Sequence, residues 1–517
     1  MSKSNIWARK PVEAFEEDMR QSGLKRVLGK WGLTAIGIGA IIGAGIFVMT
    51  GVGAKEYAGP ALALSFVAAG IGCTFAALCY AEFASFLPVE GSAYAYSYAT
   101  MGEIFAWIIG WDLILEYAMG ASAVAVGWSG YLGKFLLLFD IKLPLWLMSD
   151  SFSAQSFLRD AATSSEKMQS LISHYSSIAV PTIMGHPFAI NLPAFLIIFV
   201  ITAILVKGIK EAASANTLLV MLKLIVVLFI IIFGAGYIHP ENWHPFIPKP
   251  EMIVNPGETV AHSAYGFWGI LAGAGYIFFA YIGFDTVSTQ AGEAKDPKKD
   301  VPFGIVVSLI VCTLLYIMVA LVLTGMVNYK NIDITAPISA AFASIPGLKF
   351  AVFIISIAAL AGLTSVLIVM LLGQSRVFFA MAKDGLLPKN FFGVLHPKFR
   401  TPYKASILTG LVVAFVSAFT PISVIAELVN IGTLLAFVLV CGAVWLMRIK
   451  EPDRSRPFRV KWLPVVATLG IVSNVLIMLS LSYINWIRLF VWLAIGFAVY
   501  FLYGRYHSRL NNPTKQG

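Results

Sequence analysis

The sequence predicts an all-α integral membrane protein with twelve transmembrane helices. Hydrophobic residues make up 58% of the chain and charged residues 12%, whereas a soluble domain has about 45–50% apolar and about 25% charged residues. The apolar runs are spread evenly from Trp31 to Tyr506 with short polar gaps, and two of them are interrupted by clusters of glycine. A fold in water could not hide this much apolar surface, so one continuous helical membrane domain is expected.

Twelve segments have the length of a membrane-spanning helix, since about 20 apolar residues cross ~30 Å of hydrocarbon. We expect these helices near 31–53, 60–86, 103–132, 191–207, 215–238, 263–290, 302–326, 350–380, 403–420, 423–447, 462–482 and 486–506. The predicted domains are a cytoplasmic segment (1–30), two helical halves (31–238 and 263–447), a final helix pair (462–506) and a cytoplasmic tail (507–517). A serine-rich loop, about 133–190, is expected to place a short amphipathic helix over the outer face.

The distribution of lysine and arginine predicts the orientation, because cytoplasmic loops near helix ends carry the excess of these residues. With the N-terminus inside, 27 of the 37 basic residues lie in cytoplasmic segments, nine lie outside and Lys223 lies within a span. Both termini are therefore expected on the cytoplasmic side of the cell membrane. The net charge of +10 is spread over loops rather than gathered in a patch with exposed aromatics, which argues against a nucleic-acid partner.

The first expected helix contains four glycines in nine positions, from Gly37 to Gly45. Each glycine inside a helix costs about 0.5–1 kcal/mol relative to alanine, so the cluster needs a reason. Gly39 and Gly43 have the small-xxx-small spacing of close helix packing, and a deliberate break in the helix explains the cluster equally well.

The sixth expected helix has a similar interruption, with Gly273, Gly275 and Gly283 before Asp285. Two interrupted helices placed five apart are typical of transporters built from inverted repeats, which bind substrate at the two breaks near the membrane midplane. Backbone N–H groups freed there can hold a carboxylate, and freed carbonyls can hold an ammonium. A zwitterionic amino acid supplies both groups.

Lys223 lies about seven residues, or ~10 Å, into the fifth expected helix. An ammonium at that depth must find a partner, reach the interface or lose its proton, and intramembrane ionisable residues are functional candidates by default. We expect Lys223 to take up and release a proton during transport, with a purely structural pairing as the alternative.

Three acidic residues also lie at membrane depth. Asp112 and Glu116 are one helical turn apart and share a face of helix three, and Asp285 follows the break in helix six. Glu116 and Asp285 could attract a substrate ammonium or guanidinium, or they could pair with backbone and hydroxyl groups to close the bundle. For Asp112 we expect the structural pairing.

Signals for an enzyme, a cofactor or a metal centre are missing from the sequence. The run from Gly37 to Gly43 lacks the third glycine and the flanking elements of a dinucleotide-binding loop, and there is no Gly-x-Ser-x-Gly elbow. The seven histidines have no paired ligand spacing. All four cysteines lie inside apolar runs, so neither a disulfide framework nor a zinc site is expected.

Several segments together resemble the amino acid–polyamine–organocation (APC) permeases, and among them bacterial proteins related to the cationic amino acid transporters. The resemblance rests on Gly39 to Phe47, Tyr80 to Ala84 running into Pro88, Gly91 to Tyr96, Gly110 to Tyr117, Pro240 to Trp243 with Pro245 and Phe246, Phe278 to Asp285, and Ser375 to Pro388. It implies the LeuT-like fold of that superfamily: a five-plus-five inverted repeat with two added helices, discontinuous helices one and six, and alternating access without ATP.

The resemblance also implies a substrate site. It places the substrate's carboxylate and amine at Gly43, Ala44, Gly45, Phe279, Ala280 and Ile282. Phe279 would be an aromatic gate, Glu116 and Asp285 would line the lower pocket, and Lys223 would couple to a proton with Thr364 or Ser365 as its partner. Two residues depart from the family pattern, because Glu90 stands where relatives have a small residue and Ala44 supplies no hydroxyl to a carboxylate.

The sequence thus predicts a proton-coupled amino acid symporter, with an amino acid, a proton and the lipid bilayer as its partners. An amino acid exchanger of the same fold, a non-transporting amino acid sensor and a membrane enzyme are the alternatives. The sequence does not select the substrate's side chain, and it leaves open a small companion membrane helix.

Overall fold

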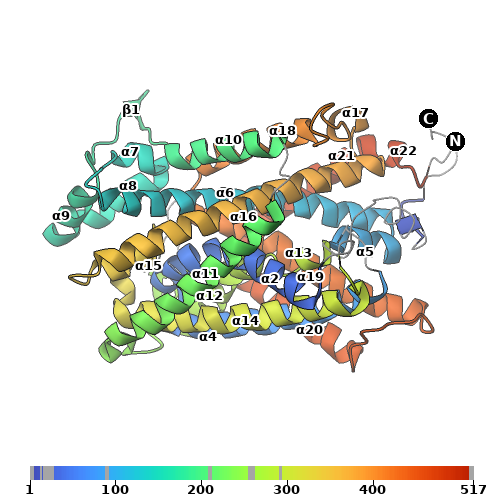
Figure 1. Cartoon of the computed structure of the whole chain (residues 1–517), viewed down its shortest axis with the longest axis horizontal. Helices are drawn as coiled ribbons and strands as arrows, with labels where there is room; N and C mark the ends of the chain where they lie inside the picture. The colour runs from blue at the N-terminus through green and yellow to red at the C-terminus, as the bar shows by residue number, and fades with distance from the viewer. Residues whose placement is uncertain are drawn as a thin grey trace.

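The computed structural model describes residues 5–11, 14–15, 28–87, 92–207, 212–253, 262–289 and 294–511. Most of its long helices run along the longest axis of the molecule (Figure 1). The short helices α7 (Leu145–Met148), α8 (Ser151–Ala161) and α9 (Ser165–His174) form one end, which we name the loop end. Helix α22 (Arg505–His507) lies at the opposite end, which we name the terminal end.

The first half of the chain contains one long uninterrupted helix, α6, of 35 residues together with several shorter ones. Its elements are α2 (Lys30–Ile41), η1 (Gly45–Met49), α3 (Thr50–Val52), η2 (Gly53–Ala58), η3 (Gly59–Ala61), α4 (Leu62–Phe86), α5 (Ser92–Thr100), α6 (Glu103–Leu137), α10 (Leu192–Lys207), α11 (Ala212–Gly234) and η4 (Ala235–Tyr237). A two-stranded hairpin, β1 (Thr182–Ile183) and β2 (His186–Pro187), projects from the loop end.

The second half begins after a linker that contains η5 (Pro240–Trp243) and the hairpin of β3 (Glu251–Ile253) with β4 (His262–Ala264). Its helices are α12 (Gly266–Ile277), η6 (Phe278–Tyr281), α13 (Thr286–Thr289), α14 (Pro297–Met326), η8 (Tyr329–Asn331), α15 (Pro337–Ala343), α16 (Lys349–Lys383), α17 (Lys389–Phe392), α18 (Tyr403–Phe419), α19 (Ile422–Lys450), α20 (Leu463–Ser480), α21 (Tyr483–Val499) and η9 (Tyr500–Gly504).

The described residues contain nine helical stretches that are long and apolar enough to cross a membrane. Helices α10 and α18 are apolar but shorter, at 16 and 17 residues. One stretch, Gly45–Phe86, is 42 residues long, or ~63 Å at the helical rise, about twice the thickness of the hydrocarbon. Gly59 lies within it at φ 62°, a turn that separates η2 from α4. A helical membrane architecture is therefore confirmed, whereas twelve crossings remain a prediction.

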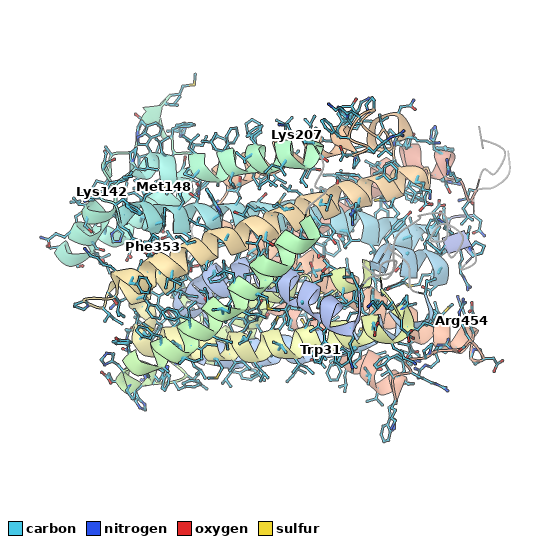
Figure 2. All side chains as sticks on the ribbon, in the orientation of Figure 1. Trp31, Lys142, Met148, Lys207, Phe353 and Arg454 are labelled. Carbon is cyan, nitrogen blue, oxygen red and sulfur yellow. The ribbon has the colours of Figure 1, made fainter. Side chains whose placement is uncertain are left out.

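Helices from the two halves pack against one another in the core. Helix α14 contacts α4 and α2, α16 contacts α6, and α10 contacts α18. Large apolar side chains are exposed along α10, α11, α14, α18, α20 and α21, which is the surface expected for a protein surrounded by lipid tails. Charged side chains such as Lys142 at the loop end and Arg454 at the terminal end lie toward the two ends of the bundle (Figure 2).

The serine-rich segment forms three short helices, α7, α8 and α9, where one was expected. Helix α8 begins after Asp150, whose carboxylate accepts hydrogen bonds from the N–H groups of Phe152 and Ser153 at 3.0 Å. Helix α9 begins after Ser164, whose hydroxyl accepts the N–H of Lys167 at 3.2 Å. Such caps satisfy N–H groups that a helix start leaves free, so these two helices are defined by their own sequence.

At the terminal end, the buried carboxylate of Glu103 joins both ends of the chain. It accepts hydrogen bonds from the hydroxyls of Tyr98 at 2.8 Å and Tyr500 at 2.9 Å, and from the side-chain amide of Asn511 at 3.2 Å. The backbone N–H of Glu103 donates to the carbonyl of Ala8 at 3.0 Å. The start of α6, the N-terminal segment and the last described residues are thereby held as one unit.

Candidate substrate site at two interrupted helices

Helix one is broken at the glycine cluster. Helix α2 ends at Ile41, Ile42 is extended with φ −73° and ψ 99°, and the chain resumes as a π-helical turn at Gly45. Residues 42–44 are buried. The sequence left packing and a break as alternatives for these glycines, and the structure contains the break.

Helix six is broken between the end of η6 and the start of α13. The 3₁₀ turn η6 ends at Tyr281, Ile282 is extended, and α13 begins at Thr286. Between them Gly283 adopts φ 116°, a conformation that side chains with a Cβ rarely take. A Cβ at Gly283 would also lie 2.9 Å from the backbone carbonyl of Ala40, so only glycine fits where the two broken helices meet.

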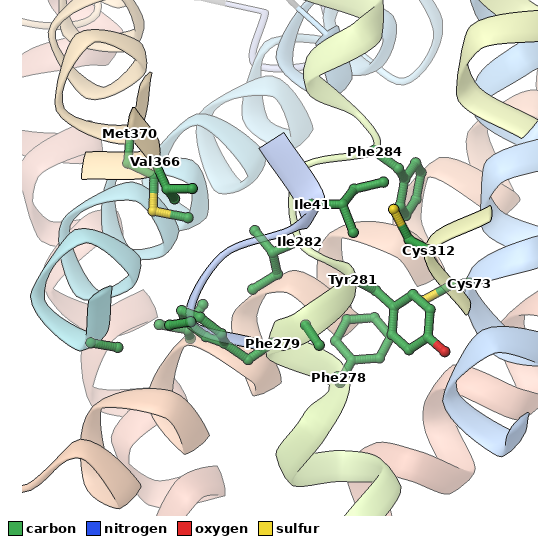
Figure 3. Packing of buried hydrophobic residues seen from close by; sticks show 14 of the residues in the cluster. Ile41, Cys73, Phe278, Phe279, Tyr281, Ile282, Phe284, Cys312, Val366 and Met370 are labelled. Atoms are coloured by element: carbon green, nitrogen blue, oxygen red, sulfur yellow. The ribbon is translucent and has the colours of Figure 1, made fainter. Parts of the chain in front are cut away.

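The two breaks lie against each other in the middle of the bundle. A Cβ at Gly45 would lie 2.4 Å from both Cα and Cβ of Ala280, so the backbones approach as closely as a glycine allows. Figure 3 shows Phe279 and Ile282 next to the end of the first helix segment. The structure thus brings together the six residues at which the resemblance placed the substrate: Gly43, Ala44, Gly45, Phe279, Ala280 and Ile282.

A single tyrosine bridges the two broken helices. The Tyr316 hydroxyl, on α14, lies 2.7 Å from the carbonyl oxygen of Ile41 and 2.8 Å from that of Ala280, and shares its one proton between them. Tyr131 on α6 donates to the carbonyl of Phe47 at 2.7 Å. Sequence reasoning missed both tyrosines. The signal available was that a buried tyrosine hydroxyl in an apolar helix usually finds a partner.

Lys223 reaches the break in helix one from α11. Its ammonium donates to the carbonyl of Gly39 at 2.9 Å, and the side chain is 1% exposed. In a continuous helix that carbonyl would accept the N–H of Gly43, which lies in the break. Gly362 on α16 leaves room for the lysine, since a Cβ there would lie 3.2 Å from Cε of Lys223.

The two hydroxyls expected beside Lys223 both lie on α16. The Thr364 hydroxyl donates to the carbonyl of Leu360 at 2.7 Å and accepts the indole N–H of Trp128 at 3.0 Å. Ser365 is buried. Their participation in proton coupling remains a prediction.

Glu116 and Asp285 are both buried and lie close enough for their charges to interact. Glu116 accepts a hydrogen bond from the Thr433 hydroxyl on α19 at 2.8 Å. Backbone N–H groups around Gly283 and Thr286 face the Asp285 carboxylate, as expected at the start of a half-helix. Both acids are therefore buried in the bundle, and Asp285 lies directly after the break in helix six.

Asp112 corrects an expectation from the sequence. Its structural pairing with backbone or hydroxyl groups was expected, yet neither carboxyl oxygen has a hydrogen-bond partner in the part of the chain that the structure describes. The side chain is 2% exposed and faces Gly432 on α19, where a Cβ would lie 3.7 Å from Oδ1. Glycine at that position removes the side chain that could have donated a hydrogen bond. Glu90, the other departure from the family pattern, lies outside the described residues.

Apolar side chains surround the two breaks on the side of α16. Val366 and Met370 face the region of Phe279 and Ile282 (Figure 3). A Cβ at Gly43 would lie 3.0 Å from Cγ2 of Val366. The site therefore combines backbone polar groups, an apolar wall and carboxylates, which suits a small molecule with a charged end and a less polar body.

The model of the family described as amino acid permease matches residues 28–506, which includes both broken helices and α11. The chain belongs to the amino acid permease family. This permease is a membrane transporter of the APC superfamily and not an enzyme. The resemblance noted from the sequence is thereby confirmed.

Two proteins of Bacillus subtilis are similar to this permease over their whole length. The branched-chain amino acid permease BcaP is 43% identical over 98% of this chain and 100% of its own. The methylthioribose transporter is 41% identical over the same shares of the two chains. The vacuolar cationic amino acid transporter 4 of Arabidopsis thaliana is 35% identical over 83% of this chain and 64% of its own.

Proposed function

We propose that this permease carries an amino acid into the cell by proton-coupled symport with alternating access. The observation that supports it best is the meeting of two broken helices at Gly45 and Ala280. The chain restarts at Gly45, and the first N–H groups of a helix have no partner within it. Such groups hold a substrate carboxylate, and the neighbouring carbonyls hold an ammonium.

The contact between Lys223 and Gly39 supports the proton coupling. A charged ammonium donates strongly to the freed carbonyl, whereas a neutral amine donates weakly and no longer needs a partner. Burial makes the charge costly unless it is compensated. Loss of the proton therefore loosens the first helix from α11, and its uptake restores the contact. Thr364 and Ser365, on the neighbouring α16, are proposed to share this proton.

Contacts between the halves support a five-plus-five repeat within twelve crossings. If the first helix corresponds to the sixth, the second to the seventh and so on, equivalent helices contact each other in four cases. These pairs are η1 with η6, α4 with α14, α6 with α16 and α10 with α18. A two-fold relation between halves, with the substrate at its centre, would place equivalent helices in this way.

The termini are proposed to face the cytoplasm of a cell whose cytoplasmic membrane holds the permease. Helix α22 lies opposite the loop end (Figure 1), so one end of the bundle must face each side of the membrane. The excess of basic residues on the terminal side supports this orientation.

Names of relatives leave several substrates to test. They specify branched-chain amino acids, methylthioribose and cationic amino acids, and one of these is not an amino acid. The buried acids Glu116 and Asp285 support a substrate with an ammonium, and Val366 and Met370 support an apolar body. An amino acid supplies both, whereas methylthioribose supplies no ammonium.

The decisive experiment is uptake into proteoliposomes. Radiolabelled isoleucine, lysine, arginine and methylthioribose are each offered with and without an inward proton gradient. We expect one amino acid class to accumulate only with the gradient. Uptake of equal size without the gradient would remove proton coupling, and uptake that requires internal amino acid would identify an exchanger. Thermal stabilisation by an amino acid without any flux would identify a sensor.

A further inference from the structure

A cavity of about 420 Å³ lies at the loop end, apart from the two breaks. Its wall comes from the end of α6, from α8 and α9, from residues 330–335 and from Lys55 on η2. Small-molecule sites in proteins have volumes of about 300–1,000 Å³, so the space suits one amino acid. None of the residues proposed to hold the substrate is part of this wall.

Charged side chains of both signs line this cavity. Lys134 and Asp333 form an ion pair at 2.7 Å, with Lys134 8% exposed. Asp160 lies between two lysines, with its carboxylate 2.7 Å from Lys167 and 3.9 Å from Lys55. Each ammonium has three donors, so these pairs leave donors for a further anion.

The wall carries more ammonium groups than carboxylates. Lys330 is a fourth lysine, and its ammonium binds Glu251 on β3 at 2.9 Å. Burial, followed by the charge of Lys134, lowers the pKa of His174, so this imidazole is neutral at pH 7. Burial alone would raise the pKa of Asp333, but the charge and hydrogen bond of Lys134 outweigh it and hold that pKa below its usual range. A carboxylate that enters the cavity therefore faces four ammonium groups and two carboxylates, those of Asp160 and Asp333.

The floor of the cavity adjoins the first broken helix. Gly130 and Thr335 meet there, since a Cβ at Gly130 would lie 2.2 Å from the carbonyl oxygen of Thr335. The next residue, Tyr131, donates its hydroxyl to the carbonyl of Phe47 just past the break. Lys55 belongs to η2, the continuation of the same helix. A molecule in the cavity would thus touch the elements that separate it from the substrate site.

We propose that this cavity is an outer docking site for a free amino acid, which binds there by its α-carboxylate and α-ammonium before it enters the substrate site. The carboxylate lies among Lys55, Lys134 and Lys167, and the ammonium lies toward Asp160 or Asp333. Because recognition uses the two groups that all amino acids share, the site accepts isoleucine and lysine alike. The inference rests on the proposed function and adds a second site to it.

Protection of a single cysteine tests occupancy without transport. The four native cysteines are buried, so a membrane-impermeant maleimide added outside reports on a cysteine introduced in place of Ser170, an exposed residue of the wall. We expect saturating L-isoleucine to slow labelling of the Ser170→Cys variant at least about threefold. A matched control is Met184→Cys on the β1–β2 turn, where the side chain is 96% exposed and labelling should not change.

Charge variants show whether the carboxylate is what binds. Lys55→Gln and Lys167→Gln, each combined with Ser170→Cys, should lose the protection, whereas Lys142→Gln should retain it. Lys142 is exposed beside the cavity and is not part of its wall. 2-Methylbutylamine, which is isoleucine without its carboxylate, should not protect. Equal labelling with and without L-isoleucine, or equal protection by the amine, would overturn the proposal.

Uptake kinetics separate this proposal from the proposed function. At low ionic strength Lys167→Gln should raise the KM for uptake about threefold and leave the maximal rate unchanged, because an exposed charge contributes modestly to binding. Protection of Ser170→Cys in a chain that transports none of the probes would contradict the proposed function and keep the docking site. If Lys167→Gln transports with an unchanged KM and L-isoleucine does not protect Ser170→Cys, the docking site is contradicted and the proposed function is kept.

Discussion

The two broken helices are held in different ways. In helix one, carbonyls on both sides of the break accept hydrogen bonds from side chains on other helices: Lys223 on α11, Tyr316 on α14 and Tyr131 on α6. In helix six, Tyr316 and Asn430 on α19 donate to carbonyls before the break, whereas carbonyls after it accept hydrogen bonds from their own segment. The Thr286 hydroxyl donates to the carbonyl of Gly283, and the Ser288 hydroxyl donates to the carbonyl of Asp285 at 2.6 Å.

This difference separates a hinge from a fixed element. The segment after the helix-six break can keep its shape wherever the helix goes, whereas both sides of the helix-one break depend on the positions of three other helices. Among the donors to the helix-one break, Lys223 loses its charge when it loses its proton. We therefore expect helix one to move in the transport cycle when the proton is exchanged and helix six to keep its local shape.

The largest effect should come from the fixed break. Gly283→Ala forces a Cβ into φ 116° and within 2.9 Å of the Ala40 carbonyl, which should lower the free energy of unfolding by about 3 kcal/mol or more. Thermal unfolding in detergent measures this. The control is Gly442→Ala on α19, where a Cβ would meet nothing within 4 Å and Tm should hold or rise. Equal Tm values for the two variants would show that the break is not strained.

The second largest effect is expected for Tyr316, which contacts both breaks. Tyr316→Phe removes a hydroxyl whose one proton is shared by two buried carbonyls. We expect a lower Tm and lower uptake, with the free energy of unfolding reduced by about 1–3 kcal/mol, the cost of a buried polar group that loses its partner. Tyr483→Phe, at a side chain that is 60% exposed, should resemble the parent chain. No loss in Tyr316→Phe would mean that water replaces the hydroxyl.

Lys223→Met tests the hinge directly. The variant keeps the apolar stem and loses the donor to Gly39, so uptake driven by a proton gradient should fall at least about tenfold, a change of ~1.4 kcal/mol. Exchange of internal for external amino acid should persist, because it needs no net proton movement. Lys349→Met, at an exposed residue of α16, is the control. Uptake by Lys223→Met that still follows the gradient would remove Lys223 from the coupling.

The smallest effect should come from a local bond in helix six. Thr286→Val removes the hydroxyl that donates to Gly283 at 2.5 Å and keeps the shape of the side chain. A single hydrogen bond contributes about 0.5–1.5 kcal/mol, so Tm should fall slightly while the gradient dependence of uptake stays intact. A change in gradient dependence would show that helix six also takes part in coupling.

The positions of the breaks could be predicted from the sequence, but their partners could not. Glycine is costly inside a helix, so Gly43, Gly45 and Gly283 mark positions where a break or close packing is expected, and the structure shows the break. Tyr316 and Tyr131 lie far from these glycines along the chain, and a tyrosine in an apolar helix has the pattern of any core aromatic. Their roles depend on which carbonyl the fold brings to each hydroxyl.

The partners of Asp112 and Glu116 likewise could not be predicted from the sequence. One helical turn places Asp112 and Glu116 on one face, and that much follows from spacing. The opposite helix then decides between them, because Thr433 offers a hydroxyl to Glu116 and Gly432 offers nothing to Asp112. No local pattern in the sequence distinguishes the two carboxylates.

The closure around Glu103 has a consequence for how the protein is made. The partners of this buried carboxylate include Tyr500 and Asn511, which follow it by 397 and 408 residues. A ribosome that has inserted the third helix has not yet produced them, and of these side-chain donors Tyr98 alone precedes Glu103. The terminal end can therefore close fully only after Tyr500 and Asn511 have been synthesised.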